Sequence, residues 1–157
     1  MVVSLRSADD VPTTPPAGLA ASDGLAALDD LAERSRATGL LVTLAVGADA
    51  ARAASGAVAT SVQRIVQEAL TNVHRHAVSP TAVDIEVRIA GADLVVTVTD
   101  DGRGAPGDDR TLGGAGFGIV GMAERAHALA GTLTAGPLDP PRHGWRVEAT
   151  LPLAPRP

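Results

Sequence analysis

Several residue types are missing or scarce in this chain of 157 residues. It contains no cysteine, no lysine and no tyrosine, with a single phenylalanine and a single tryptophan. The absence of cysteine excludes disulfides and thiolate metal sites. The absence of lysine excludes a P-loop, because that class of ATP site requires its lysine. Since aromatic residues are so rare, the core must be built from Val, Leu, Ile and Ala.

Long apolar runs and concentrated basic charge are also missing. No stretch approaches the roughly 20 apolar residues of a membrane span, and no signal peptide is visible. The formal net charge is -5 and no basic run appears, which argues against a nucleic-acid surface. The chain is 45% hydrophobic and 20% charged, a composition typical of one globular domain with a substantial core.

Helical and strand patterns alternate along the chain. The predicted helices cover residues 22–38, 62–77 and 117–130, and the predicted strands cover residues 41–46, 83–89, 94–99, 132–135 and 145–151. Residues 48–57 are expected to form a loop or a short helical turn. This order predicts an α+β two-layer sandwich, with helices on one face of a mixed, mostly antiparallel sheet.

The helix predicted over residues 62–77 carries an unusual polar edge. Glu68, Asn72 and His76 are spaced four residues apart, so their side chains stack beside the apolar stripe. An amide oxygen such as that of Asn72 suits Mg²⁺, which prefers few protein ligands plus phosphate oxygens. Glu68 could orient or deprotonate an attacking group, and Arg75 and His76 could donate to phosphates. The simpler alternative is an ordinary amphipathic helix whose polar edge is solvated.

Asp100 ends a predicted strand on its apolar side. It shares the parity of Leu94, Val96 and Val98, so its carboxylate should point toward the core. A buried carboxylate needs hydrogen-bond donors, and the amino group of a base such as adenine would supply one. Alternatively, Asp100 caps its own turn.

Glycines follow Asp100 in two groups. Gly102 and Gly104 allow a sharp turn that a flat ligand could approach, although turn glycines need no ligand. Gly116, Gly118 and Gly121 open a predicted helix, whose bare N–H groups form a natural phosphate cradle. Taken alone, that glycine spacing is a weak signal. A dinucleotide-binding Rossmann unit is not expected, because no strand directly precedes these glycines.

Together these segments resemble the ATP-binding domain of sensor histidine kinases, in the superfamily that also includes gyrase, Hsp90 and MutL. Residues 67–77 resemble the N box of that family, residues 100–104 the G1 box, and residues 116–122 the G2 box. The residues of these three boxes are most similar to those of the branch that pairs with helix-turn-helix response regulators. The resemblance implies a Bergerat fold over residues 22–153, flanked by an irregular segment at 1–21 and a tail at 154–157.

The resemblance also implies roles for individual residues. Glu68 would be the catalytic base, Asn72 would bind Mg²⁺, Asp100 would accept the adenine amino group, and residues 105–116 would form a lid. The implied nucleotide-binding set is Asn72, Arg75, His76, Asp100, Gly102, Gly104, Gly116, Phe117, Gly118, Gly121 and Met122. The implied function is transfer of the γ-phosphate of Mg-ATP to a histidine on a separate dimerisation segment, in a cytoplasmic protein or the cytoplasmic part of a membrane-bound kinase.

Two departures from the family pattern stand out. Trp145 follows Gly144 where the family often has threonine, and the dimerisation segment with its phosphoacceptor histidine is missing, unless residues 1–7 are its last turn. Two alternatives therefore remain open within the superfamily: a stand-alone anti-sigma-type serine kinase, and a non-catalytic nucleotide-binding interaction domain.

Overall fold

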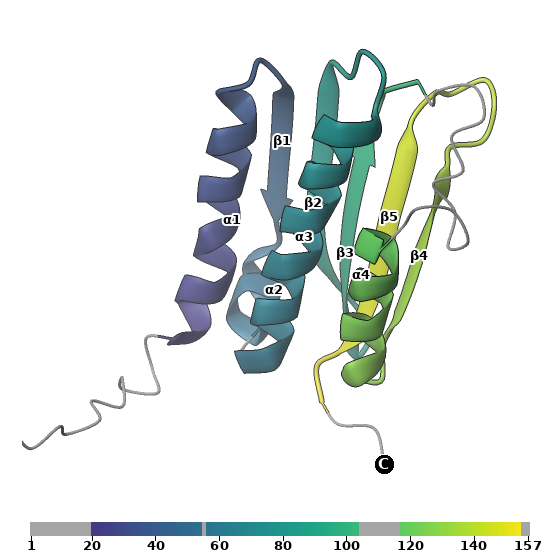
Figure 1. The fold of residues 1–157 in the computed structure, drawn as a ribbon. Helices are drawn as coiled ribbons and strands as arrows, with labels where there is room; N and C mark the ends of the chain where they lie inside the picture. Colours follow the sequence, from purple (N-terminus) through teal and green to yellow (C-terminus); the bar gives the residue numbers. More distant parts are fainter. Residues whose placement is uncertain (1–19, 55, 104–116, 155–157) are drawn as a thin grey trace, which may run out of the picture.

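Five strands form one sheet, and the helices lie together on one of its faces (Figure 1). A computed structural model describes residues 20–54, 56–103 and 117–154 of the chain. The elements in chain order are α1 (Ala20–Arg36), β1 (Leu41–Val46), α2 (Ala48–Ala53), α3 (Gly56–His76), β2 (Ala82–Ala90), β3 (Asp93–Asp100), α4 (Phe117–Ala128), β4 (Thr132–Pro137) and β5 (Trp145–Pro152).

The strand order in the sheet is β1-β2-β3-β5-β4. Only β1 and β2 run parallel, and the other three neighbouring pairs are antiparallel. In Figure 1, α3 lies between α1 and α4 across the front of the sheet. The predicted α+β two-layer sandwich with a mixed, mostly antiparallel sheet is therefore confirmed.

The core fills the space between the sheet and its helix layer. On β2, Val83, Ile85 and Val87 are buried while the alternate residues are exposed, as the period-two pattern predicts. The stripe of α3 that faces the sheet and its neighbouring helices consists of Ala59, Val62, Ile65, Val66, Ala69, Leu70 and Val73. Aliphatic side chains thus build the core, as the scarcity of aromatic residues requires.

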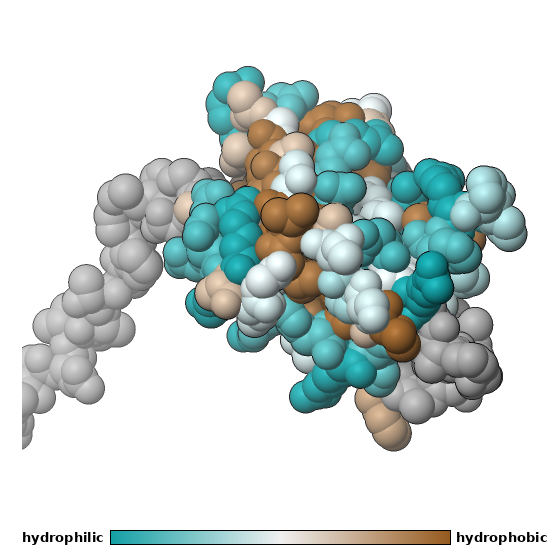
Figure 2. Space-filling view, turned by 90° about the horizontal axis from the view of Figure 1, so that it is seen from above, coloured by the Kyte–Doolittle hydropathy of each residue, from teal (hydrophilic) through white to brown (hydrophobic). Residues whose placement is uncertain are grey.

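Hydrophobic residues also reach the surface at one end of the molecule. Seen from above, a band of hydrophobic residues lies between hydrophilic ones (Figure 2). Among the described residues, the exposed large hydrophobic side chains are Leu41, Val78, Phe117 and Val120. Val120 is 39% exposed, because the helix presents Ile119, Met122 and Ala126 to the core.

Several helix boundaries differ from those predicted. The central helix begins at Gly56 rather than residue 62, because Ala59 continues the buried stripe one turn earlier. The first helix begins at Ala20, within the segment predicted to be irregular, and α4 ends at Ala128. Ala130 has a φ of 56°, and the Gly131 N–H donates to the Ala126 carbonyl, which ends that helix. No helix within the described ranges is long and apolar enough to cross a membrane.

Candidate functional site

The polar edge of α3 contacts the start of α4. Glu68 is half-buried, and its side chain lies against Gly118 so closely that a Cβ on that glycine would overlap the carboxylate oxygen. The Cδ atom of Glu68 would be 3.0 Å from such a Cβ. A side chain at position 118 would therefore displace the Glu68 carboxylate, which lies against the first turn of α4.

The remaining polar residues of α3 divide by exposure. Asn72 is half-buried, one turn from Glu68, whereas Arg75 and His76 are exposed. His74 is also exposed, and its Nε2 lies 3.4 Å from the hydroxyl oxygen of buried Ser35 on α1. The predicted row is thus partly covered at its Glu68 end and open at its His76 end.

Asp100 is buried, as its parity predicted. Its side chain is 4% exposed, and its Oδ1 accepts a hydrogen bond of 2.8 Å from the Gly102 N–H. This bond is the turn cap that was the alternative role for Asp100. A carboxylate has two oxygens that each accept more than one bond, so the cap is compatible with a ligand contact as well.

The turn after Asp100 is packed against the end of α3. A Cβ on Gly102 would lie 2.7 Å from the Ala77 Cβ and 2.9 Å from Asp100 Oδ1, so no side chain fits there. Beyond it, the Val78 N–H donates to the Arg103 carbonyl at 2.9 Å, and the Arg103 N–H donates back at 3.0 Å. These contacts join the predicted G1 segment to the predicted N box.

Asp101 occupies the opposite environment from its neighbour. It is exposed, and it accepts hydrogen bonds from the Thr81 N–H at 2.8 Å, the Ala82 N–H at 2.9 Å and the Thr81 hydroxyl. Partial burial acts to raise the pKa of Asp101, but the bonds from Ala82 and Thr81 outweigh it, so the pKa lies below its ordinary value. Asp101 thus anchors the start of β2.

The first turn of α4 contains most of the predicted G2 residues. Phe117 is 95% exposed, Gly118 and Gly121 are half-buried, and Met122 is fully buried. This turn contains no acidic residue, so no side-chain carboxylate within it opposes an anion at the helix start. Gly104, Gly116 and the predicted lid at 105–116 lie outside the described residues.

Gly144 makes a close backbone contact that sequence reasoning missed. Its φ is 133°, and a Cβ there would overlap the carbonyl oxygen of Asp100. Trp145, the next residue, is paired across the sheet with Asp100. The only signal in the sequence was a glycine directly before a strand. Such a glycine suggests that another backbone segment comes close, but it does not identify that segment.

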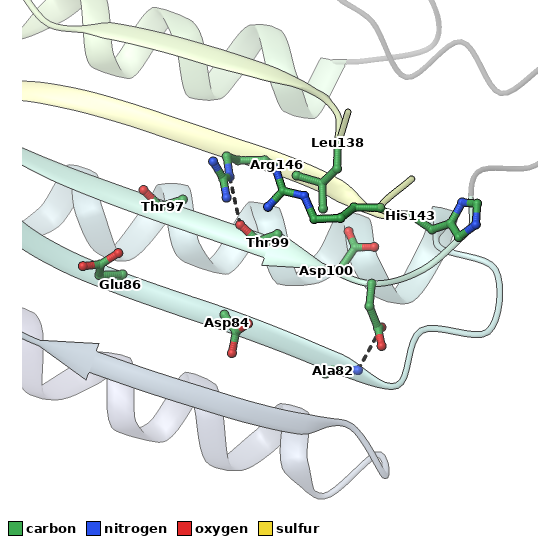
Figure 3. Close-up of a pocket in the computed structure, with 11 residues that line it drawn as sticks. Ala82, Asp84, Glu86, Thr97, Thr99, Asp100, Leu138, His143 and Arg146 are labelled. Carbon is green, nitrogen blue, oxygen red and sulfur yellow. Dashed lines mark hydrogen bonds between the residues drawn. The ribbon is translucent and has the colours of Figure 1, made fainter. Parts of the chain in front are cut away.

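A second feature lies on the face of the sheet away from the helices. A shallow cavity of about 440 Å³ is lined by Ala82, Asp84, Glu86, Thr97, Thr99, Asp100, Asp101, Leu138, Arg142, His143 and Arg146. Figure 3 shows Asp84 and Glu86 on one side and Arg146 on the other, with Arg146 donating to the Thr99 hydroxyl at 3.2 Å. No residue of α3 or α4 lines this cavity, and Asp100 is the one predicted site residue in its lining.

Residues 57–155 match the family model described as "Histidine kinase-, DNA gyrase B-, and HSP90-like ATPase". The chain is 40% identical over 96 residues to the sensor histidine kinase YxjM of Bacillus subtilis, and 38% identical over 89 residues to the signal transduction histidine-protein kinase/phosphatase UhpB of Salmonella typhimurium. These matches cover 61% and 57% of the chain. They cover only 22% and 16% of the two relatives.

Solved structures share the fold. The histidine kinase domain of the Erythrobacter litoralis EL346 blue-light activated histidine kinase aligns with a TM-score of 0.66 at 20% identity, covering 88% of this chain and 63% of that one. The mycobacterial sensor histidine kinase MprB aligns with a TM-score of 0.55 at 18% identity, covering 82% and 97%. The family match covers more than half of the chain, so the chain belongs to the histidine kinase-, gyrase- and HSP90-like ATPases, as an ATP-binding catalytic domain of the sensor histidine kinase type.

Proposed function

We propose that this chain binds Mg-ATP and donates the γ-phosphate to a histidine on a dimerisation segment, as the catalytic part of a two-component sensor histidine kinase. One observation supports this above all: both glycine segments contact the same helix. Glu68 of α3 lies against Gly118, and Ala77 lies against Gly102. These contacts support a single site formed along α3 by residues from both glycine segments.

Asp100 and the glycines would bind the two ends of the nucleotide. Asp100 would accept the adenine amino group, while Gly102 and Gly104 let the backbone approach the ring. At the other end, N–H groups at the start of α4 would donate to phosphate oxygens. The proposed phosphate-side residues are Arg75, His76, Gly116, Phe117, Gly118, Gly121 and Met122.

Asn72 would hold Mg²⁺ through its amide oxygen. The described part of the chain has no group of three or more His, Asp or Glu side chains that could hold a metal. The single amide oxygen of Asn72 fits Mg²⁺, which commonly takes one or two protein oxygens and completes its shell with phosphates and water. When bound, the ion neutralises charge on the transferring phosphate.

Glu68 is the proposed catalytic residue. The attacking imidazole nitrogen forms a bond to the γ-phosphorus while the bond to the β,γ-bridging oxygen breaks, and ADP leaves. Glu68, fixed against α4, would orient the imidazole or accept its proton. Its carboxylate is half-buried beside Gly118, where the phosphates are proposed to bind.

The acceptor histidine is proposed to lie on another segment. His74 and His76 belong to α3, His127 belongs to α4, and His143 lies between β4 and β5. None of these four is followed by an acidic residue, which usually follows the acceptor in this family. A histidine fixed in α3 cannot reach the γ-phosphate in line without breaking the helix, and in-line positioning is most of this catalysis.

The remaining assignments are proposals of the same kind. The domain would span residues 22–153. The complete protein would act in the cytoplasm, on a response regulator with a helix-turn-helix output domain. The two curated relatives named above are sensor kinases, which favours this proposal over a serine kinase or a non-catalytic domain.

Calorimetry and phosphotransfer together test the proposal. Mg-ATP and Mg-ADP should bind with affinities between micromolar and millimolar, about 4–8 kcal/mol, and NADH should not bind. With labelled ATP, acid-labile phosphate should appear only when a separate dimerisation-helix fragment is added. Acid-labile label on this chain alone would contradict the assignment of a donor-only domain, and acid-stable label on an added protein would indicate a serine kinase.

A further inference from the structure

Trp145 lies beside Asp100 on the helix-covered face of the sheet. The two residues are direct partners in the antiparallel pairing of β3 with β5. Directly opposed residues point their side chains to the same face, with Cβ atoms about 4.5–5.5 Å apart. Trp145 also shares the parity of buried Val147 and Ala149, and its side chain packs against the edge of the core. The cavity on the opposite face is not lined by Trp145.

The backbone fixes this neighbourhood tightly. Gly144 approaches the Asp100 carbonyl so closely that no side chain fits between the two strands. On the other side of Asp100, Gly102 is pressed against Ala77 of α3. The start of β5, the end of β3 and the end of α3 therefore form one rigid corner, and Trp145 is part of it.

Trp145 is more exposed than the other residues of β5 that face the helices. Val147, Ala149 and Leu151 are buried, whereas Trp145 is half-buried, so the row opens to the surface at the indole. An aromatic face beside a hydrogen-bonding carboxylate is the combination that binds a heterocyclic base, because the face stacks on the ring while the carboxylate reads an edge group. A base whose amino group donates to Asp100 would be close enough to contact the indole ring of Trp145.

We propose that Trp145 forms an aromatic wall of the base-binding site and stacks on the adenine ring. This inference rests on the proposed function, since it requires a nucleotide at Asp100. Trp145 thereby takes a direct part in base binding at the position where related kinases often have threonine. The alternative is that the indole only closes the edge of the core, and that alternative predicts no dependence on the base.

The test uses the fact that Trp145 is the only tryptophan and that the chain has no tyrosine. Titration with Mg-ADP should change the tryptophan emission, while inorganic tripolyphosphate with Mg²⁺, which lacks a base, should not. Calorimetry on the same samples reports binding independently. Trp145→Leu should lose about 10-fold in ADP affinity, equivalent to ~1.4 kcal/mol, while Trp145→Phe should retain most of it.

Two controls separate base binding from folding. Arg146→Gln changes the next residue, whose side chain lies on the opposite face, and should leave ADP affinity unchanged (Figure 3). Tripolyphosphate affinity should be equal in Trp145→Leu and the wild type. An equal loss of ADP and tripolyphosphate binding would overturn the inference, because it would show a general structural effect.

The emission experiment needs no variant, so it remains decisive if a variant fails to fold. Heat of ADP binding without any change in emission would overturn this inference and leave the proposed function standing. No heat with either ATP or ADP would overturn both.

Discussion

Asp100 and Asp101 are adjacent in the chain, yet the sheet gives them opposite surroundings. Asp100 is buried on the helix-covered face, where its Oδ1 caps the turn at Gly102. Asp101 is exposed and accepts three hydrogen bonds from Thr81 and Ala82. Because side chains alternate between faces of a strand, two identical residues serve different purposes. The buried one caps the turn at Gly102, and the exposed one holds the start of β2.

The same contrast extends over both faces of the sheet. Glu68 and Asn72 lie in the helix layer, partly covered and beside α4. On the open face, Asp84 and Glu86 are exposed among threonine and arginine side chains (Figure 3). Carboxylates are present on both sides, so carboxylate content alone does not locate the site. The two faces differ in how far their carboxylates are shielded from water. The shielded carboxylates make the stronger electrostatic contacts, because such a contact is stronger where water is excluded.

The largest effect is expected at Glu68. Glu68→Gln should lower phosphotransfer to the dimerisation-helix fragment about 10²- to 10⁴-fold, the usual contribution of a general base, while nucleotide affinity changes little. The matched control is Glu86→Gln on the open face, which should transfer phosphate as the wild type does. Initial rates at saturating Mg-ATP measure the difference, and equal losses in both variants would remove the distinction between the two faces.

A smaller effect is expected when the two neighbouring aspartates are exchanged for asparagine. Asp100→Asn presents an amide donor to the adenine amino group, so ADP affinity should fall by about 1–3 kcal/mol. The fold should persist, because the amide oxygen can still accept from Gly102. Asp101→Asn should bind ADP normally. Calorimetry with ADP and GDP compares the variants, and unchanged ADP affinity in Asp100→Asn would reduce Asp100 to a turn residue.

Gly102→Ala should damage the joint between β3 and α3. The added Cβ would lie 2.7 Å from the Ala77 Cβ, so the backbone must shift, at a cost of about 2 kcal/mol in the free energy of unfolding. Gly136→Ala on β4 is the matched control, since nothing lies within 4 Å of its added Cβ. Urea unfolding measures both, and a Gly102→Ala protein as stable as Gly136→Ala would contradict the close packing.

The smallest effect concerns the anchor at Asp101. Its hydrogen bonds lower its pKa, so the ionised carboxylate contributes stability that is present above the ordinary aspartate pKa. That stability is lost as the pH falls through the lower pKa of the folded state. Asp101→Asn should therefore be less stable than the wild type near pH 7, by only about 0.5 kcal/mol because solvent screens an exposed group.

The pH dependence of the Asp101→Asn variant provides its own check. Urea unfolding midpoints of the wild type and the variant should converge as the pH falls below the lowered pKa that Asp101 has in the folded state. A difference that stayed constant over the whole range would mean that the charge of Asp101 is irrelevant to the anchor.

The alternation of residues in β2 and β3 was sufficient to predict their burial. Val83, Ile85 and Val87 face inward as expected, and so does Asp100. The start of α3 was harder to predict, because residues 56–61 contain glycine and small residues with little periodic signal of their own. Packing of Ala59 against the core decided that boundary. Helix ends depend on such contacts more than on local preference.

The sequence by itself determined the order of elements, the two-layer fold class and the residue types available for the site. It did so because apolar spacing and glycine placement act locally along the chain. Only the tertiary structure decided that Glu68 rests on Gly118, that Gly102 fits against Ala77, and that Trp145 is paired with Asp100. These partners lie between 25 and 50 residues apart, so their contacts depend on strand register and helix packing, which no local pattern specifies.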